Sequence, residues 1–329
     1  MSNLIENNES SDGIDRRGFL KCMAWAGAGV VWAMKGGILQ SRAFGAEDAG
    51  GAAAAASDFE FVQVSDSHIG FNKGVYTDVV GTFEQAVSRI NSLAKPPSLV
   101  LHTGDLSHLS KPQEFDTVEQ VMKGIKTQRS FYVPGEHDYF VDNGKRYLDR
   151  FGKGTLGAGW QSFDFNGVHF IGLVNVANLS NGKTALGVLG DDQLDWLQKD
   201  LADRGPSTPI VVFAHVPLWT IYEQWGWGTQ DSARAMQMLT RFGSVTVLNG
   251  HIHQVLQKIE GNISFHTARS TAFPQPEPGK AESPGPMKNV PAARLKEFLG
   301  IRQVDFVAHD GTLAVTDSRL AEPTTQPGA

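Results

Sequence analysis

Five short segments of the sequence place histidine or aspartate directly after an apolar, strand-like run. They are Ser65-Asp66-Ser67-His68, Thr103-Gly104-Asp105, Gly135-Glu136-His137-Asp138, Ala214-His215 and Gly250-His251-Ile252-His253. The spacing of two in Asp66-x-His68 and in His251-x-His253 puts both side chains of each pair on one side of an extended chain. Two such pairs, with a shared carboxylate and further imidazoles, can enclose two cations. A ligand set of carboxylate and imidazole without thiolate suits Fe, Mn or Zn.

A single segment of this kind is a weak signal. A buried histidine is most often a core residue with satisfied hydrogen bonds, and aspartate after a strand is often a turn former. Five such segments in one chain, all ligand-capable and all after strands, favour a metal centre over coincidence.

The segments need a scaffold that brings their strands together. From Asp58 the chain alternates short β-rich runs with longer helical patterns, which predicts a largely parallel first sheet. Loops that leave the strand ends of an α/β sheet are where sites assemble, because the sheet fixes their roots. The expected strands cover residues 59–64, 98–102 and 131–133, and the expected helices cover residues 77–93 and a stretch opening at Lys111-Pro112.

The second half of the domain is richer in strands. We expect helices at residues 191–201 and 232–242, and strands at residues 160–165, 168–174, 210–214, 245–248, 255–259 and 263–266. Two mixed sheets face to face, with helices outside, account for so many strands in one domain. The Pro-rich residues 273–291 predict a loop, and a final hairpin of residues 302–308 and 312–316 is expected to close a sheet edge.

The N-terminus has the pattern of an export signal. Arg16-Arg17 precedes a weakly apolar, Gly/Ala-rich stretch, which predicts a twin-arginine signal peptide over residues 1–46 rather than a membrane span. The alternative is a chance Arg pair before an amphipathic helix. The expected mature chain is periplasmic or secreted, has no stable membrane span, and has lost the single cysteine, Cys22. Its partner during export would be the twin-arginine machinery.

The remaining boundaries follow from composition. Residues 47–57 read as a flexible lead-in, residues 58–320 as one domain, and residues 321–329 as a disordered tail. The chain of 329 residues is 41% hydrophobic and carries a net charge of −6, so no nucleic-acid surface is evident. An anionic substrate would have to be attracted by local positive charge, which bound cations provide.

The five segments, taken in order, resemble the calcineurin-like metallophosphoesterase superfamily. The similarity runs from about Phe59 to His266. The resemblance implies an α/β fold, a four-layer α/β/β/α sandwich of two mixed sheets, with a dinuclear metal centre at its edge. Within the superfamily the chain is most similar to a bacterial branch of cyclic-nucleotide phosphodiesterases. That similarity rests on Ser65-Asp66-Ser67-His68-Ile69-Gly70 and on Gly104-Asp105-Leu106-Ser107 followed by Glu114-Phe115.

The resemblance also implies roles for single residues. It assigns the first metal to Asp66, His68 and His253, the bridging position to Asp105, and the second metal to His215 and His251. His137 is expected to contact the substrate and to give a proton to the leaving group. Asp138 is expected to lie behind His137, to orient its ring and to raise its basicity. The implied activity is hydrolysis of a small phosphate ester, possible substrates including cyclic nucleotides.

One position departs from the family pattern. Glu136 stands where the family motif normally has Asn, which adds a negative charge beside an anionic substrate. Three consequences are open, namely tighter binding of the second metal with slower turnover, a different preferred metal, or a different substrate. We favour Glu136 as a substitute ligand of the second metal. The alternative function is a metal-loaded binding or accessory protein with weak or no turnover. His108, three residues after Asp105, is a further ligand candidate that we leave out of the predicted set, as a turn residue is the more frequent role there.

Two weaker signals lie near the last segments. Trp219, Tyr222, Trp225 and Trp227 follow His215, and they would form either an aromatic wall beside the metals or the packing of a long loop. Arg269 would pair either with phosphate or with a surface carboxylate.

Overall fold

Two facing β-sheets form the centre of the molecule. The computed structural model describes residues 57–127, 129–179, 185–308 and 312–321, and the backbone of residues 29–35 and 38–44. In the first sheet, β3 (Phe59–Val64), β4 (Leu99–Thr103) and β5 (Ser130–Val133) pair in parallel. The hairpin of β12 (Gly300–Val307) and β13 (Thr312–Arg319) extends this sheet antiparallel to β3, so it closes one edge as expected.

The second sheet has the order β10-β11-β9-β8-β7-β6. Its four central strands pair in parallel, and the edge strands β6 and β10 are antiparallel. The strands are β6 (Gln161–Phe165), β7 (Val168–Leu173), β8 (Ile210–Ala214), β9 (Val245–Asn249), β10 (Gln257–Glu260) and β11 (Ile263–Thr267). Both sheets are therefore mixed.

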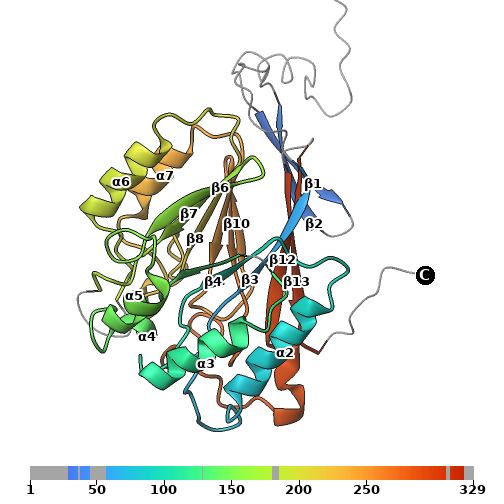
Figure 1. Cartoon of the computed structure of the whole chain (residues 1–329), viewed down its shortest axis with the longest axis vertical. Coiled ribbons are helices and arrows are strands. Elements are labelled where there is room, and N and C mark those ends of the chain that lie inside the picture. The colour runs from blue at the N-terminus through green and yellow to red at the C-terminus, as the bar shows by residue number, and fades with distance from the viewer. Residues whose placement is uncertain are drawn as a thin grey trace, which may run out of the picture.

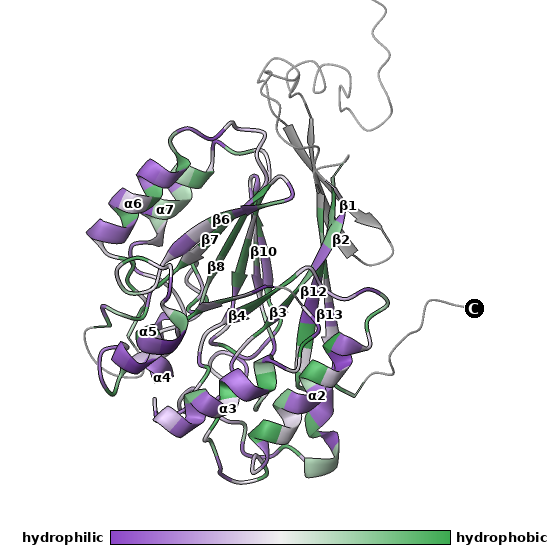
Figure 2. Cartoon of the chain, viewed as in Figure 1, coloured by the Kyte–Doolittle hydropathy of each residue, from purple (hydrophilic) through white to green (hydrophobic). Residues whose placement is uncertain are grey.

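Helices cover the outer face of each sheet. Figure 1 shows α2 (Val79–Asn91) and α3 (Pro112–Met122) beside the first sheet, and α6 (Asp191–Leu201) and α7 (Ser232–Leu239) beside the second. Figure 2 shows that each of these helices carries both hydrophobic and hydrophilic residues, as helices with one buried face do. The four-layer α/β/β/α sandwich is confirmed.

Alternation along the strands builds the layers. Phe61 of β3 and Phe213 of β8 share one apolar cluster between the sheets. The next residue along β3, Val62, packs in the cluster that includes α2 and α3 residues, whereas Val212 of β8 packs with α6 and α7 residues. Successive side chains of a strand point to opposite faces, so each central strand supplies both the inner core and one outer core.

Some expected elements differ in detail. The strand expected at residues 255–259 lies at Gln257–Glu260, where all four residues are exposed. Two short helices, α4 (Glu136–Tyr139) and α5 (Lys145–Phe151), were not expected. Short 3₁₀ segments occur at Glu223–Trp225 and Ala292–Glu297. These elements are too short to show helical periodicity in sequence.

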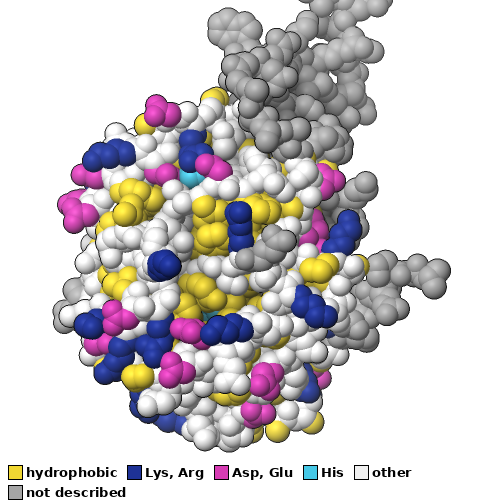
Figure 3. Space-filling view, viewed as in Figure 1, with side chains coloured by type: hydrophobic (Ala, Val, Ile, Leu, Met, Phe, Trp, Pro, Cys, Tyr) yellow, Lys and Arg dark blue, Asp and Glu magenta, His cyan; other side chains and the backbone are white. Residues whose placement is uncertain are grey.

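The N-terminal signal stays a prediction. Arg16-Arg17 and the tail from residue 322 lie outside the described residues. Within the expected leader, the backbone of β1 (Gly29–Lys35) and β2 (Ile38–Phe44) forms an antiparallel hairpin, and β2 lies against β13. Among the described residues, no helix has the length and apolar character needed to cross a membrane. On the face drawn in Figure 3, acidic and basic side chains are interspersed.

Candidate metal centre

The five segments converge at the carboxyl ends of β3, β4, β5, β8 and β9. Because parallel strands end at the same edge of a sheet, the loops that follow them meet. The seven expected metal ligands are all buried, with exposed fractions between 0% and 9%. These residues are Asp66, His68, Asp105, Glu136, His215, His251 and His253.

Most of these residues have an unusual backbone conformation. Asp66, His68, Asp105, His251 and His253 have positive φ angles of 54°, 40°, 49°, 69° and 56°. Each such residue costs about 1–3 kcal/mol and persists where the surrounding structure enforces it. The loops enforce it on one another, since the amides of Asp66 and His68 donate to the carbonyls of Gly104 and Asp105 at 3.0 and 2.9 Å. Strain of this kind is typical of functional sites.

The first group of facing side chains is Asp66, His68 and His253. His253 Nε2 lies 3.2 Å from Asp66 Oδ1 and 3.2 Å from His68 Nε2. His253 Nδ1 donates to the carbonyl of Phe273 at 2.6 Å. That bond leaves the lone pair of His253 Nε2 directed at the other two residues. The three ligand atoms lie close enough together to hold one metal ion.

The second group is Glu136, His215 and His251. Glu136 Oε2 lies 2.9 Å from His215 Nε2, and Glu136 Oε1 lies 3.1 Å from His251 Nδ1. His215 Nδ1 donates to the carbonyl of Thr103 at 2.7 Å, so His215 Nε2 is free to bind a cation. Glu136 is thus placed among the histidines as a ligand would be. One ligand atom from each of these three residues could hold a second ion.

Asp105 lies between the two groups. Its Oδ2 atom is 3.4 Å from His68 Nε2 and 3.5 Å from His215 Nε2. Its Oδ1 atom accepts the backbone N–H of His137 at 2.9 Å. Gly135 makes this placement possible, because a Cβ there would lie 2.0 Å from Asp105 Oδ1. One carboxylate therefore faces both groups.

Unsatisfied buried atoms show that these residues suit metal ions. Glu136 Oε2, His215 Nε2 and both ring nitrogens of His251 have no hydrogen-bond partner in the described part of the chain. Two of these atoms are nevertheless only 2.9 Å apart, in an orientation that is not a hydrogen bond. Buried polar atoms without partners are costly, and a cation would satisfy them together.

Burial and neighbouring charges keep Glu136 ionised and His68 neutral, the forms in which these side chains bind a metal. Burial alone would raise the pKa of Glu136, but His251 and His215 hold this pKa well below its usual value. Burial lowers the pKa of His68 well below its usual value, and nearby histidines lower it further. His68 is therefore neutral, which is the form of histidine that binds a metal.

His137 borders the centre at the start of α4. Its Nδ1 donates to the carbonyl of His108 at 2.8 Å, which leaves Nε2 as the nitrogen available to a ligand. Burial alone would lower the pKa of His137, but the carboxylates of Asp105 and Glu136 raise it above its usual value. His137 is thus suited to carry a proton.

The expected orienting role of Asp138 is wrong. Its carboxylate accepts the backbone N–H groups of Leu106, Ser107 and Gly135 and the Ser107 hydroxyl, at 2.8–3.0 Å. The ring of His137 is held by the His108 carbonyl. Burial, aided by the Asp105 charge, raises the pKa of Asp138 to about 7. Asp138 ties two of the ligand loops together and reaches His137 only as a nearby charge, which raises the pKa of that histidine.

A cavity of about 480 Å³ opens over the centre. Its floor includes His68, Asp105, Glu136 and His251, and its walls include His108 and His137. The remaining walls are largely apolar. Their residues include Phe71, Tyr76, Trp225, Trp227, Phe273, Pro284, Pro286 and Met287.

The Pro-rich loop forms one wall of this cavity and is fixed at several points. Tyr76 Oη donates to the carbonyl of Met287 at 2.6 Å. Gln275 Nε2 donates to the carbonyl of His251 at 2.7 Å, and Gln275 Oε1 accepts the N–H of Gly285 at 2.9 Å. The loop is therefore attached to a candidate ligand segment.

The expectations for the aromatic residues after His215 and for Arg269 have different outcomes. Trp225 and Trp227 line the cavity, whereas Trp219 packs against Phe265 of β11. Arg269 is not among the residues lining the cavity, and its Nη1 donates to the carbonyl of Phe298 at 3.4 Å. Sequence reasoning missed two cavity residues, Lys73 and Lys288, because single lysines in loops carry no pattern.

Comparisons with known proteins agree with this geometry. Residues 59–255 match the family model described as calcineurin-like phosphoesterase. A 3′,5′-cyclic-nucleotide phosphodiesterase of Nostoc sp. is 24% identical over 217 residues, 64% of this chain and 77% of that protein. A glycerophosphodiester phosphodiesterase of Enterobacter lignolyticus is 23% identical over 274 residues, 80% of this chain and 96% of that protein.

Solved structures show the same fold. A purple acid phosphatase from yellow lupin superposes with a TM-score of 0.60 at 15% identity, covering 87% of this chain and 57% of the phosphatase. A dimetal phosphatase from Danio rerio superposes with a TM-score of 0.55 at 13% identity, covering 80% of this chain and 98% of the other.

The fold, the ligand groups and these relatives together define a metal-dependent phosphoric ester hydrolase. The chain belongs to the calcineurin-like phosphoesterase family.

Proposed function

We propose that the chain hydrolyses phosphodiesters with two metal ions, one held by Asp66, His68 and His253 and the other by Glu136, His215 and His251. The strongest support is the position of Asp105, whose Oδ2 atom lies 3.4 Å from His68 Nε2 and 3.5 Å from His215 Nε2. A carboxylate placed so evenly between two ligand groups is suited to bridge two cations. Fe, Mn and Zn match the donor set.

The residues around the centre have distinct parts in the reaction. Two cations held by these residues would lower the pKa of a water molecule and would supply positive charge for the phosphoryl oxygens. His137 donates a proton to the departing alkoxide through Nε2, because Nδ1 is occupied by the His108 carbonyl. The Asp105 Oδ1 atom fixes the backbone of His137 at 2.9 Å, so the acid keeps its place relative to the centre.

The cavity supports an ester with a bulky organic group. Its volume of about 480 Å³ is in the range of small-molecule sites. Aromatic residues such as Phe71 and Trp225 line the cavity, so its walls suit the apolar part of an organic ester. We therefore propose cyclic nucleotides as the first substrate class to test, and the name of the Nostoc relative supports this choice.

Metal analysis combined with two model esters tests this proposal. The protein is expected to contain two transition-metal equivalents and to hydrolyse bis(4-nitrophenyl) phosphate faster than 4-nitrophenyl phosphate, and chelation should abolish both rates. Faster hydrolysis of the monoester would show that the activity is that of a phosphatase and not of a phosphodiesterase. Fewer than one metal equivalent in folded protein would contradict the proposed ligand set.

The alternative function is metal-loaded binding without turnover. The three carboxylates of Asp66, Asp105 and Glu136 supply more negative charge than a set with Asn would, and they oppose an anionic ester. Two metal equivalents without hydrolysis of any phosphate ester, cyclic nucleotides included, would favour this alternative. Substrate-dependent turnover would exclude it.

We further propose that the protein is exported by the twin-arginine route to the periplasm or beyond. Arg16-Arg17 and the apolar stretch after it support this. Replacing both arginines with lysine should retain the full-length protein in the cytoplasm. Export of that variant together with the unchanged protein would contradict the proposal.

A further inference from the structure

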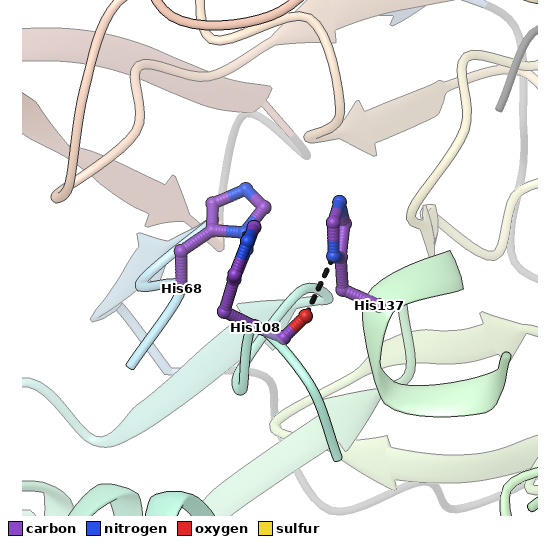
Figure 4. A group of neighbouring side chains, drawn as sticks. All are labelled: His68, His108 and His137. Carbon is purple, nitrogen blue, oxygen red and sulfur yellow. Dashed lines mark hydrogen bonds between the residues drawn. The ribbon is translucent and has the colours of Figure 1, made fainter. Parts of the chain in front are cut away.

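The ring of His108 contacts both a candidate metal ligand, His68, and the candidate acid, His137. His108 belongs to the loop after β4, and its backbone N–H donates to the carbonyl of Ile69 at 2.9 Å. Figure 4 shows the three rings grouped together, with the His108 carbonyl bonded to the His137 ring. These three histidines have ring nitrogens close enough together to form a potential ligand group. His108 could therefore either bind a metal itself or hold His68 in the orientation that binds one.

The contact with His68 is made on the side away from the proposed first metal. His108 Nδ1 lies 3.4 Å from His68 Nδ1. The opposite nitrogen, His68 Nε2, faces Asp105 Oδ2 at 3.4 Å and His253 Nε2 at 3.2 Å. His108 therefore approaches the outer nitrogen of the ligand ring, which is where a supporting partner is placed.

The contact with His137 is a stack. The rings of His108 and His137 have centroids 4.5 Å apart and planes inclined by 21°. Phe71 packs edge-on against His108 at 4.9 Å, with an interplanar angle of 78°. These two neighbours fix the plane of the His108 ring, so its Nδ1 stays directed toward His68.

We infer that His108 is a positioning residue whose Nδ1 accepts the Nδ1–H of His68. This hydrogen bond selects the His68 tautomer with its lone pair on Nε2, directed at the first metal. Metal-binding histidines generally donate their other N–H to an acceptor, and losing that acceptor typically weakens metal binding by about 10–100-fold. The inference rests on the proposed dinuclear centre.

Two variants separate the hydrogen bond from the stacking. His108→Phe keeps an aromatic ring against His137 and Phe71 but has no acceptor. His108→Asn loses the ring but keeps an acceptor, because its side-chain oxygen lies about as far from the backbone as histidine Nδ1. A third variant, His253→Ala, identifies which binding step belongs to the first metal.

Metal-free protein is titrated with Mn²⁺, and both affinities are measured for each variant. His108→Phe should bind the first Mn²⁺ about 10–100-fold more weakly than the unchanged protein. His108→Asn should stay within about threefold, since it restores the acceptor. Thermal melting of the metal-free variants controls for folding.

Two results would overturn the inference. One is an unchanged first affinity in His108→Phe, and the other is equal weakening in both variants, which a direct metal ligand or a packing role would produce. If the proposed dinuclear centre itself is wrong, the unchanged protein will bind fewer than two Mn²⁺ ions, which distinguishes that failure from a failure of the His108 inference.

Discussion

Glu136 Oε2 lies 2.9 Å from His215 Nε2, and neither atom has a hydrogen-bond partner among the described residues. The two atoms face each other as ligands of a common cation would. The carboxylate thus occupies the position where the family motif has a neutral amide. This substitution is the main way in which the site departs from the pattern that its sequence resembles.

Glu136→Asn should therefore weaken binding of the second metal. The variant removes one negative charge beside a cation, and a loss of about 1.4 kcal/mol corresponds to a tenfold lower affinity. The measurement is Mn²⁺ titration of the metal-free protein. Glu119→Gln, on the outer side of α3, is the charge-matched control. An unchanged second affinity would show that the negative charge of Glu136 does not contribute to binding of the second metal.

His137→Ala should lower kcat and leave the metal content unchanged. General acid catalysis contributes about 10²–10⁴-fold, and His137 does not belong to either proposed ligand group. The measurement compares kcat for a 3′,5′-cyclic nucleotide, whose leaving group is an alkoxide that needs a proton, with metal content in the same preparation. Unchanged kcat would remove His137 from the reaction, and a parallel loss of metal would make it a ligand.

Gly135→Ala should disturb both folding and the centre. The new Cβ would lie 2.0 Å from Asp105 Oδ1 and 2.4 Å from the Asp105 backbone nitrogen. Overpacking typically costs about 1–3 kcal/mol, and here it would displace the proposed bridging carboxylate. Denaturant unfolding and metal content are the measurements. Gly205→Ala is the control, because its nearest neighbour, Ser207 Oγ, is 3.9 Å away. Equal behaviour of the two variants would contradict the account.

Lys73 and Lys288 should assist capture of an anionic substrate. Both are exposed at the cavity and have no salt bridge within the described residues. Changing both to Gln should lower kcat/KM about fivefold to tenfold at low salt, and high salt should reduce the difference. Lys123→Gln, on the surface after α3, is the control. A difference that persists at high salt would point to a structural cause.

His266 should make the fold sensitive to acid. Its ring is buried and, within the described chain, neither nitrogen has a hydrogen-bond partner. Burial, and then the charge of Arg302, lower its pKa to about 3. Between its unfolded value near 6.5 and this folded value, the unfolded state binds more protons, so stability falls as pH falls.

His266→Leu removes this proton-linked loss. Relative to the unchanged protein, the variant should gain about 4 kcal/mol between pH 7 and pH 3, at 1.36 kcal/mol per pKa unit. Denaturant unfolding at several pH values measures the difference in the free energy of unfolding. A difference that does not vary with pH would contradict the assignment.

The fold could be predicted largely because its strands alternate cleanly. β3 and β8 direct successive side chains into different cores, and their patterns predicted the strand bounds to the residue. The edge strand β10 is exposed throughout and has no buried face to mark its start, so the predicted strand began two residues too early. The helix α4 has four residues, too few for a periodic pattern, and its existence depends on the loop contacts around Asp138.

The candidate site could be predicted in its ligand residues but less well in its supporting contacts. Motif spacing indicated the groups that meet around Asp105. It could not indicate that the carbonyl of His108 holds His137, because a backbone acceptor carries no residue type. The placement of Lys73 near the Pro-rich loop depends on the Tyr76–Met287 hydrogen bond, which joins residues 211 positions apart.

Two metal ions are proposed to lie on either side of Asp105, and anomalous diffraction from crystals grown with Mn²⁺ would locate them. Two anomalous peaks are expected, one among Asp66, His68 and His253 and one among Glu136, His215 and His251, with Asp105 Oδ2 between them. A single peak, or a second peak outside these residues, would contradict it.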